Sequence, residues 1–510
     1  AASRCDIFSQ LHVGVTRVRD VDGFVGTVMY VGPVPSAKNA TEIYAGIAWD
    51  DASRGKHNGS VICRTTNQLV RLFHCQGGSF LRLGRLDLGV TLDPELLQSK
   101  YVDMNAPVVA PNNILPHTAR TAGGRDKPIE FLGEMNIRKR QQLDDLDKIS
   151  LRSLGISRAC LDESMTRFQH LKEIDLAGNL LSDWHVVFTI LRQFPLLEYV
   201  SLASNRILDI PPHILESSPP ASLANISVLN LNSCSIQSFQ TIQWIANAMP
   251  QLEELCVAYN DLSDIQTVVH GFDNLSFLDC SSCNLDSWNK VDYFGKLPRL
   301  KHFILNDNDI TNVSIQEERF QTLRSLQLAG TSIASWKDLD GIRSLQELKS
   351  LRFRNTPLTS TMGAGEARSI VIARIPNLEF LNASPISNKE RVEAERRYVS
   401  SVARELLLHD ENKNQILLLH PRFQELARLH QDSMTTSVGS NHGGGPATQA
   451  VNVTIRSMAA DSCSMEPLQK RLPGGLKVGR LKAMCLRAYG LDMDRQLLHA
   501  KREKDDAFPT

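Results

Sequence analysis

Short stretches in which apolar and polar residues alternate recur through the middle of the chain. Each follows the pattern L-x-x-L-x-L-x-x-N/C/T-x-L, where L is an apolar residue, as in LKEIDLAGNLL at residues 171–181. The inner L-x-L predicts a short strand whose alternate side chains enter a core. Successive units begin 23 to 30 residues apart. The starts are Leu146, Leu171, Leu197, Ile226, Leu252, Leu275, Leu300, Leu323, Leu348 and, for a last partial unit, Leu378.

This period is typical of leucine-rich repeats, which run over roughly 20–29 residues. The Asn, Cys or Thr closes the turn from inside, and the residues after it return along the convex side. One unit cannot bury its apolar face alone, so the units must stack. We therefore predict a parallel-stranded α/β solenoid over residues 129–385.

The residues after the last repeat predict a cover for the end of this solenoid. The segment 386–432 is read as a helical C-terminal cap, in which Ser387 and Glu390 have the spacing of a capping box. Terminal caps with a polar outer face fill this role in solenoids. Residues 433–449 are rich in Gly, Ser and Thr and predict a flexible linker.

The last segment, 450–510, has a third pattern. Residues 451–457 alternate as a half-buried strand does, and Val478, Leu481, Cys485 and Ala488 recur at helical spacing. RQLLHAKR at 495–502 is read as a further strand. This order resembles a ubiquitin-like β-grasp domain, although a final strand is missing from the pattern, so we expect the β-grasp to be incomplete.

The N-terminal residues 1–88 contain many glycines among short Val, Ile and aromatic runs. This texture predicts a small, irregular β domain with tight turns. Residues 89–128, with several Pro and Gly, are read as a linker that leads into the solenoid.

Within that N-terminal segment, the run GKHNG at residues 55–59 carries the most specific motif. With AWD at 48–50, FHC at 73–75 and GSF at 78–80, it resembles the CAP-Gly domain family, whose signature is Gly-Lys-Asn-Asp-Gly. The resemblance implies binding of extreme C-termini that end in acidic residues and an aromatic residue, as in α-tubulin.

The residue types suit such a ligand. Lys56 supplies a cation and the Asn58 amide a donor, and a charge-assisted hydrogen bond contributes roughly 1.5–3 kcal/mol. Glycines on both sides allow the backbone to approach the ligand closely. Aromatic walls would hold its terminal ring. The predicted tail-peptide site is Gly55, Lys56, His57, Asn58, Gly59, Phe24, Tyr44, Trp49 and Phe80.

The chain departs from the family signature at two positions, since His57 replaces Asn and Asn58 replaces Asp. About five extra residues also lie within VICRTTNQLVR at 61–71. Two interpretations stay open here: a reshaped groove, and a β domain with structural glycines and no ligand site.

The concave solenoid face is a second candidate site, for a protein partner. Strand residues between the buried leucines must point outward there, and aromatic and Arg residues are typical anchors of protein interfaces. The residues proposed for this face are Arg152, Tyr199, Phe277, Ile304, Arg352 and Arg354. The alternative is a solvated concave surface with binding on the convex side or an edge.

The composition of the chain excludes several classes of function. The 56 Lys and Arg balance 56 Asp and Glu, so no overall charge favours nucleic acid or a membrane surface. No apolar run approaches the roughly 18–20 residues of a membrane helix. The 10 cysteines are not spaced as in disulfide-rich scaffolds, which predicts a cytoplasmic protein.

No catalytic motif is found in the sequence, whether a phosphate loop, Gly-x-Ser-x-Gly or His-Glu-x-x-His. Cys280 and Cys283 form a Cys-x-x-Cys, but in repeat register both fall at inward positions, so we interpret them as core residues rather than metal ligands. We predict a protein that is not an enzyme and needs no cofactor or metal.

The order of CAP-Gly domain, leucine-rich repeats and ubiquitin-like domain resembles the tubulin-folding cofactor E family. The resemblance implies a chaperone, associated with the cytoskeleton, that acts in assembly or dissociation of the αβ-tubulin heterodimer. Its implied partners are α-tubulin, other tubulin-folding cofactors and, through the ubiquitin-like domain, the proteasome. The alternatives are a microtubule-associated CAP-Gly adaptor and a CAP-Gly enzyme of the deubiquitinase type.

Overall fold

The structure is a computed structural model, and its chain divides into two compact units. One unit comprises Ala1–Tyr398 with His409–His420, and the other comprises Val399–Leu408 with Pro421–Thr510. The described residues are 11–39, 41–101, 118–120, 126–128, 146–160, 168–217, 219, 223–265, 271–430, 450–458, 464–473, 476 and 478–498. The predicted linker at 433–449 and the predicted start of the solenoid at 129–145 lie outside them.

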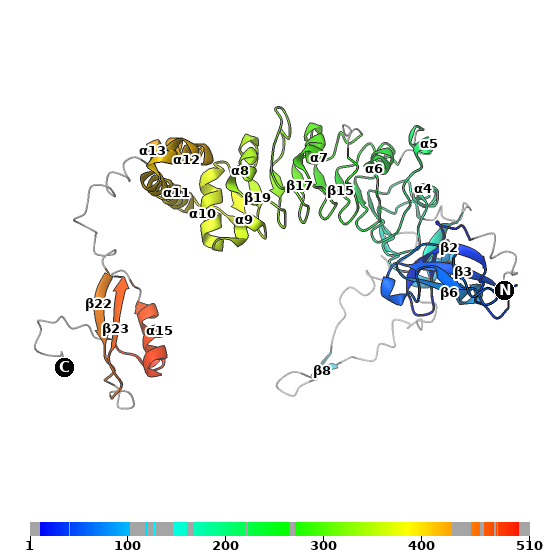
Figure 1. The fold of residues 1–510 in the computed structure, drawn as a ribbon, viewed down its shortest axis with the longest axis horizontal. Coiled ribbons are helices and arrows are strands. Elements are labelled where there is room, and N and C mark those ends of the chain that lie inside the picture. The colour runs from blue at the N-terminus through cyan, green and yellow to red at the C-terminus, as the bar shows by residue number, and fades with distance from the viewer. Residues whose placement is uncertain are drawn as a thin grey trace, which may run out of the picture. The chain divides into compact units, whose positions relative to one another are not determined.

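The first unit begins with a small antiparallel sheet of order β1-β2-β3-β6 (Figure 1). Its strands are β1 (Arg17–Arg19), β2 (Val25–Pro33), β3 (Ile43–Trp49) and β6 (Gly78–Arg82). The short η1 (Ala52–Arg54) and η2 (Leu83–Arg85) and the hairpin of β4 (Ser60–Ile62) and β5 (Leu69–Arg71) complete it. One sheet face buries Val18, Val28, Ala45, Ile47 and Trp49 in a compact core. The predicted small β domain is therefore confirmed.

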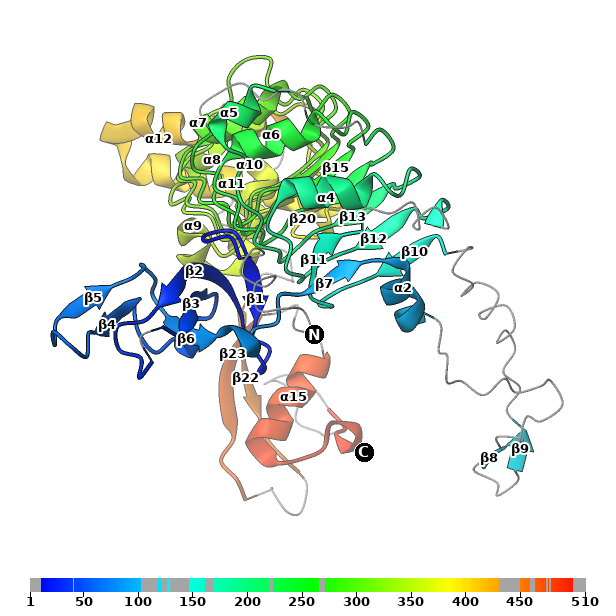
Figure 2. The same cartoon turned by 90° about the vertical axis from the view of Figure 1, so that its right-hand side faces the viewer.

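The segment after this domain corrects the predicted 89–128 linker. Strand β7 (Val90–Leu92) pairs in parallel with β11 (Ile156–Ala159), and helix α2 (Pro94–Tyr101) follows it directly (Figure 2). Leu92 and Leu97 are fully buried in the solenoid core. This part of the segment belongs to the solenoid. A single short strand and helix have no period, so the sequence pattern did not reveal them. Further on, β8 (Thr118–Arg120) pairs with β9 (Asp126–Pro128).

The solenoid is built on an 11-stranded sheet whose strands follow chain order (Figure 1). The pairing is parallel from β10 to β20, and the last pair, β20 with β21, is antiparallel. In each three-residue strand the middle residue faces the core, as Ile174, Val200 and Leu229 do with almost no exposed surface. The strands are β10 (Lys148–Ser150), β12 (Glu173–Asp175), β13 (Tyr199–Ser201), β14 (Val228–Asn230), β15 (Glu254–Cys256), β16 (Phe277–Asp279), β17 (His302–Ile304), β18 (Ser325–Gln327), β19 (Ser350–Arg352), β20 (Phe380–Leu381) and β21 (Ser384–Pro385). The predicted repeat strands are confirmed.

A buried polar residue closes the turn after the strand in several repeats. The Asn260 side chain accepts from the backbone N–H of Cys234 and Ile236 at 3.1 and 3.0 Å. It also donates to the carbonyls of Leu231 and Val257, both at 2.8 Å. One amide thus satisfies four backbone groups that would otherwise be buried without partners.

The convex side carries short helices, several of which start in the same way (Figure 2). A polar N-cap precedes an aromatic residue that enters the core, as in Asp183-Trp184, Ser238-Phe239 and Ser287-Trp288. Asp183 and Ser238 accept a backbone N–H of the first turn, as N-caps do. The elements are α4 (Trp184–Leu191), α5 (Pro212–Leu215), α6 (Phe239–Ala246), α7 (Trp288–Asp292), η5 (Tyr293–Lys296), α8 (Trp336–Leu339), η6 (Asp340–Ser344), α9 (Pro357–Ser360) and α10 (Ala364–Arg374).

Helices follow the last repeat, as predicted. They are α11 (Asn388–Leu408), η7 (Asp410–Asn412), α12 (Lys413–Leu419) and α13 (Phe423–Leu429). Half of the predicted capping box is present, since the Glu390 N–H donates to Ser387 Oγ at 3.1 Å. The Glu390 carboxylate instead forms an ion pair with Arg368 of α10 at 2.6 Å. The nearly buried Arg374 joins α10 to α12 through the Leu419 carbonyl at 2.5 Å.

Within the second unit, β22 (Ala450–Ile455) and β23 (Leu468–Pro473) form an antiparallel hairpin. Helix α15 (Val478–Tyr489) and η8 (Met493–Arg495) follow it. Tyr489 joins helix and hairpin, because its hydroxyl donates to the Ile455 carbonyl at 2.6 Å and accepts from the Leu468 N–H at 3.0 Å. The buried face of α15 contains Cys485 and Tyr489, whereas Val478 and Ala488, which were predicted for it, are exposed. These elements do not by themselves establish a ubiquitin-like domain.

Candidate peptide-binding site

The GKHNG loop is held against the edge of the N-terminal sheet. It lies between η1 and β4, and the Lys56 N–H donates to the Gly78 carbonyl at 2.7 Å. The Gly78 N–H donates in return to the His57 carbonyl at 2.6 Å. This small bridge fixes the backbone of the loop while the Lys56 and Asn58 side chains stay exposed.

The two glycines of the loop approach the protein's own backbone, which revises their predicted role. A Cβ at Gly55 would lie 2.2 Å from the carbonyl carbon of Gly77, and one at Gly59 would lie 2.0 Å from the Phe73 oxygen. Gly59 also has φ +90°, which side chains rarely adopt, whereas Gly55 is extended at φ −72°. The glycines therefore close the loop onto its neighbours rather than open it to a ligand.

Four aromatic rings gather beside the loop on one face of the sheet. Phe80 is central: its ring centroid lies 4.7 Å from His57, 5.5 Å from Phe73 and 6.1 Å from Tyr30. We call these four residues the aromatic cluster. Gly46 of β3 makes room for it, because a Cβ there would lie 2.5 Å from the Phe73 ring.

His57 enters the cluster as a neutral ring. The Gly59 N–H donates to His57 Nδ1 at 3.0 Å, so the neutral ring carries its proton on Nε2. Partial burial lowers the pKa of His57 from its ordinary value, because it disfavours the charged form. At neutral pH His57 thus adds an aromatic surface, stacked on Phe80 at 27°, rather than a charge.

The cationic group of the site is Lys56. Its side chain is exposed next to the aromatic cluster and makes no hydrogen bond or ion pair with any described residue. Asn58 is likewise exposed. A neutral aromatic surface beside an uncompensated ammonium is an arrangement that can hold an aromatic residue with a carboxylate.

Two predicted wall residues lie elsewhere. Trp49 is only 5% exposed in the core on the opposite sheet face, where its Nε1 donates to Ser79 Oγ at 3.1 Å. Phe24 lies near it, and the Arg54 guanidinium is 5.4 Å from the Trp49 ring and 5.5 Å from the Phe24 ring. Neither ring joins the aromatic cluster. Trp49 faces the other way because successive strand residues face opposite sides of a sheet, and Phe24 lies before β2 begins.

Tyr44 does share the face of the aromatic cluster, two residues from Gly46 along β3. Its hydroxyl donates to Glu42 Oε2 at 2.7 Å, and Arg82 pairs with the same carboxylate at 2.8 Å. Tyr44 therefore lies at the margin of the site. Tyr30 and Phe73 were not assigned from the sequence. The pairing of Gly46 with Phe80 could have suggested them, because a glycine opposite a large ring leaves space for further rings.

The concave residues lie on the strands or directly after them. Phe277 of β16 faces His302 of β17 with ring centroids 6.3 Å apart, and Tyr199 and Ile304 are half-buried on the same face. Arg152 forms an ion pair with Asp175 at 3.4 Å. Arg354, two residues beyond β19, is exposed, while Arg352 is half-buried. The face thus presents aromatic groups in its middle and arginines toward its ends.

The Cys-x-x-Cys pair belongs to the solenoid core, as predicted. Cys280 and Cys283 are free thiols without exposed surface, and the Cys283 thiol donates to the Val257 carbonyl at 3.1 Å. Burial raises the pKa of the Cys283 thiol to about 12. Across the described part of the chain, no cluster of His, Cys, Asp and Glu is arranged to hold a metal ion. No described helix is both long and apolar enough to cross a membrane.

Comparison with known families defines the class of the protein. Residues 13–86 match the CAP-Gly domain family, and residues 262–409 match a leucine-rich repeat family. The chain is therefore a CAP-Gly protein with leucine-rich repeats, and both resemblances predicted from the sequence are confirmed.

Over nearly its whole length the chain is a homologue of tubulin-folding cofactor E. It is 28% identical to tubulin-folding cofactor E of Arabidopsis thaliana over 95% of this chain and 91% of the relative. It is 28% identical to tubulin-specific chaperone E of Danio rerio over 92% and 89% of the two chains. The corresponding protein of Homo sapiens is 26% identical over 95% and 92%. These relatives are named as chaperones and folding cofactors, in agreement with the prediction of a non-enzymatic protein.

Proposed function

We propose that this protein is a tubulin-folding chaperone that binds α-tubulin and acts in the assembly or dissociation of the αβ-tubulin heterodimer. The observation that carries the proposal is the nearly full-length similarity to tubulin-specific chaperone E proteins. The exposed Lys56 beside the aromatic cluster agrees with it, because a CAP-Gly domain of that kind suits an acidic, aromatic C-terminus.

In this proposal, polar groups and aromatic rings bind different parts of the α-tubulin tail. Lys56 and the Asn58 amide bind carboxylates of the tail, and the aromatic cluster holds the terminal ring. A charge-assisted hydrogen bond contributes about 1.5–3 kcal/mol, which corresponds to about tenfold or more in affinity. A few such contacts give an affinity near micromolar, which suits a tail that is released later.

The concave solenoid face is proposed to bind the folded body of tubulin. Phe277 with His302 and the half-buried Tyr199 and Ile304 provide aromatic and apolar anchors, and Arg352 and Arg354 provide charge at one margin. Two weak sites in one chain then act together through effective concentration.

The remaining parts of the proposal follow the family resemblance. Residues 450–510 are proposed to form a ubiquitin-like domain that contacts the proteasome, supported by the order of hairpin and helix. The protein is proposed to work in the cytoplasm with other tubulin-folding cofactors. If the chain without residues 450–510 still co-sedimented with proteasomes as the full chain does, this role of the segment would be excluded.

The direct test measures binding of the full chain to purified αβ-tubulin, intact or with the α-subunit tail removed. Lys56→Ala should weaken binding to intact tubulin about tenfold and should leave binding to tail-less tubulin unchanged. Lys38→Ala is the matched control, because Lys38 is exposed in the same domain, between β2 and β3. Unchanged affinity after both tail removal and Lys56→Ala would exclude the tail-binding mechanism.

Two further measurements use the same reagents. Phe277→Ala should weaken the residual binding to tail-less tubulin, whereas Leu196→Ala, at an exposed apolar position outside the strands, should not. The amount of intact heterodimer should change when the protein and added cofactors are present. A constant amount would argue against the chaperone function itself.

A further inference from the structure

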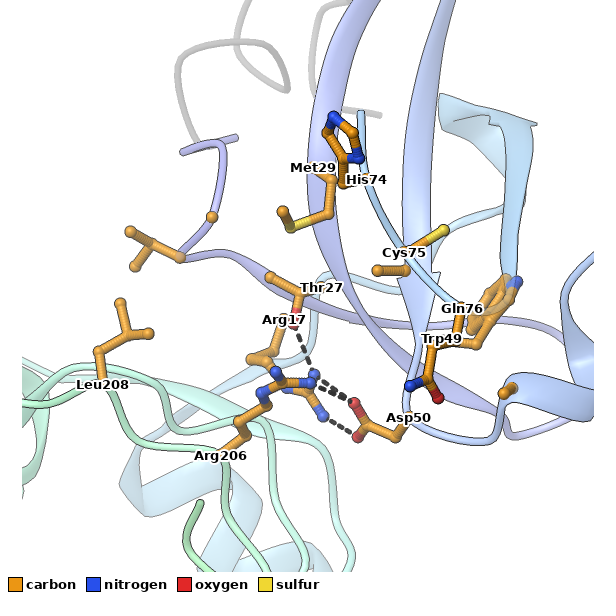
Figure 3. A pocket seen from close by; sticks show the side chains of 14 residues that line it. Arg17, Thr27, Met29, Trp49, Asp50, His74, Cys75, Gln76, Arg206 and Leu208 are labelled. Atoms are coloured by element: carbon orange, nitrogen blue, oxygen red, sulfur yellow. Dashed lines mark hydrogen bonds and ion pairs between the residues drawn. The ribbon is translucent and has the colours of Figure 1, made fainter. Parts of the chain in front are cut away.

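The sheet face that carries the aromatic cluster continues into a cavity shared with the solenoid. Gly46 lies beneath the aromatic cluster, and Ala48, two residues on along β3, lines a cavity of about 410 Å³ (Figure 3). Two residues of strand span about 7 Å. Cys75 borders both places, because it lines the cavity and its Sγ lies 3.8 Å from the His57 carbonyl oxygen.

Two arginines share one carboxylate in this cavity. Arg17 of β1 is buried, binds both oxygens of Asp50 and donates to Thr27 Oγ1 at 2.8 Å. Arg206, in the turn after β13 of the solenoid, places its Nη1 3.3 Å from Asp50 Oδ1. Figure 3 shows both guanidinium groups directed at the same carboxylate. Among the described residues that line the cavity, Asp50 is the sole acid, so the cluster carries an excess positive charge.

The excess charge belongs mainly to Arg206. Arg17 is occupied by Asp50 and Thr27, apart from a buried Nε that has no partner. The Arg206 side chain is 48% exposed and makes a single ion pair. Its other N–H groups have no partner among the described residues. A guanidinium with unused donors favours a second carboxylate, which it can bind through two parallel hydrogen bonds.

We propose that this cavity binds an acidic side chain of the same peptide whose C-terminus occupies the aromatic cluster, with Arg206 as the residue that holds it. The inference rests on the proposed tail-binding function and extends it. An extended peptide advances about 3.3 Å per residue, so a glutamate two or three residues before the terminal aromatic residue reaches the cavity. One incoming carboxylate would balance the two arginines and Asp50. The solenoid therefore completes the peptide site of the CAP-Gly domain.

The test compares two synthetic peptides on the full-length protein. Both end in a glutamate and a C-terminal tyrosine; the residues upstream are glutamates in one and glutamines in the other. Fluorescence anisotropy gives the Kd of each. The wild-type protein should prefer the glutamate peptide by about threefold to tenfold. Arg206→Gln should remove most of this preference and leave the Kd of the glutamine peptide unchanged, while Arg206→Lys should retain part of the preference.

Arg343→Gln is the matched control, because it removes the same charge at an exposed position in η6, on the convex side. It should preserve the preference. If Arg206→Gln keeps the full preference while Lys56→Ala weakens binding of both peptides, the inference is overturned and the tail-binding function stands. If the wild-type protein binds neither peptide, or Lys56→Ala changes neither Kd, the tail-binding function fails and the inference fails with it.

Discussion

The solenoid and the CAP-Gly domain hold their turns in opposite ways. In the solenoid, Asn205, Asn260 and Asn308 each close a turn with the same kinds of backbone hydrogen bond, in every second repeat. In the CAP-Gly domain, the contacts of Gly55 with Gly77 and of Gly59 with Phe73 occur once each. The environment of a solenoid residue thus follows from its place in the period. That of a CAP-Gly residue follows from which distant segment the fold brings beside it.

The largest expected effect is on the stability of the solenoid. Asn260→Ala removes the partners of four buried backbone groups, so we expect about 3–4 kcal/mol of lost stability in the surrounding repeats. Hydrogen exchange followed by mass spectrometry should show faster exchange in β14 and β15, with the CAP-Gly domain unchanged. Asn274→Ala is the control, since its amide bonds the Pro250 carbonyl at an exposed position. Equal effects of the two variants would contradict this role of Asn260.

A somewhat smaller effect is expected on the stability of the CAP-Gly domain. Gly59→Ala places a Cβ against the Phe73 oxygen at a positive φ, so we expect about 2–3 kcal/mol of destabilisation. Exchange should accelerate in β4 to β6 and not in the repeats. Gly84→Ala in the same domain meets no atom within 4 Å and should change stability by less than about 0.5 kcal/mol. Normal exchange in Gly59→Ala would show that the loop relaxes around the new methyl group.

The smallest expected effect is the dependence of the stability of the CAP-Gly domain on pH. Because the pKa of His57 is lowered in the folded state, the unfolded chain binds its proton more strongly. The contribution of His57 to stability is therefore complete above a pH of about 6.5 and is lost as the pH falls below that value. Urea unfolding of the CAP-Gly domain at pH 7.5 and 5.5 should show this decline. His57→Phe, which keeps a ring but cannot titrate, should reduce it; an equal decline in the variant would assign the effect to other groups.

The sequence alone was sufficient for the repeats of the solenoid. Its strands lie at the predicted L-x-L positions, with Ile174 inward and Glu173 and Asp175 outward, because a period of about 25 residues repeats the same local choice many times. The motif GKHNG likewise located Lys56 and the loop beside Phe80. The strand and helix over Val90–Tyr101 were not predicted, because they occur once and carry no period.

The side chains that meet around Lys56 could be identified only from the tertiary structure. A bulge between Val28 and Tyr30 shifts the register of β2 against β3 and brings Tyr30 to the face of Phe80, while Trp49 turns into the core. Arg206 lies 156 residues beyond Asp50 in the chain, yet the two form an ion pair. The sequence by itself determined the repeats and the chemical character of the loop, since both are local patterns. The faces of an irregular sheet and the contact between distant segments depend on long-range packing, which no local pattern encodes.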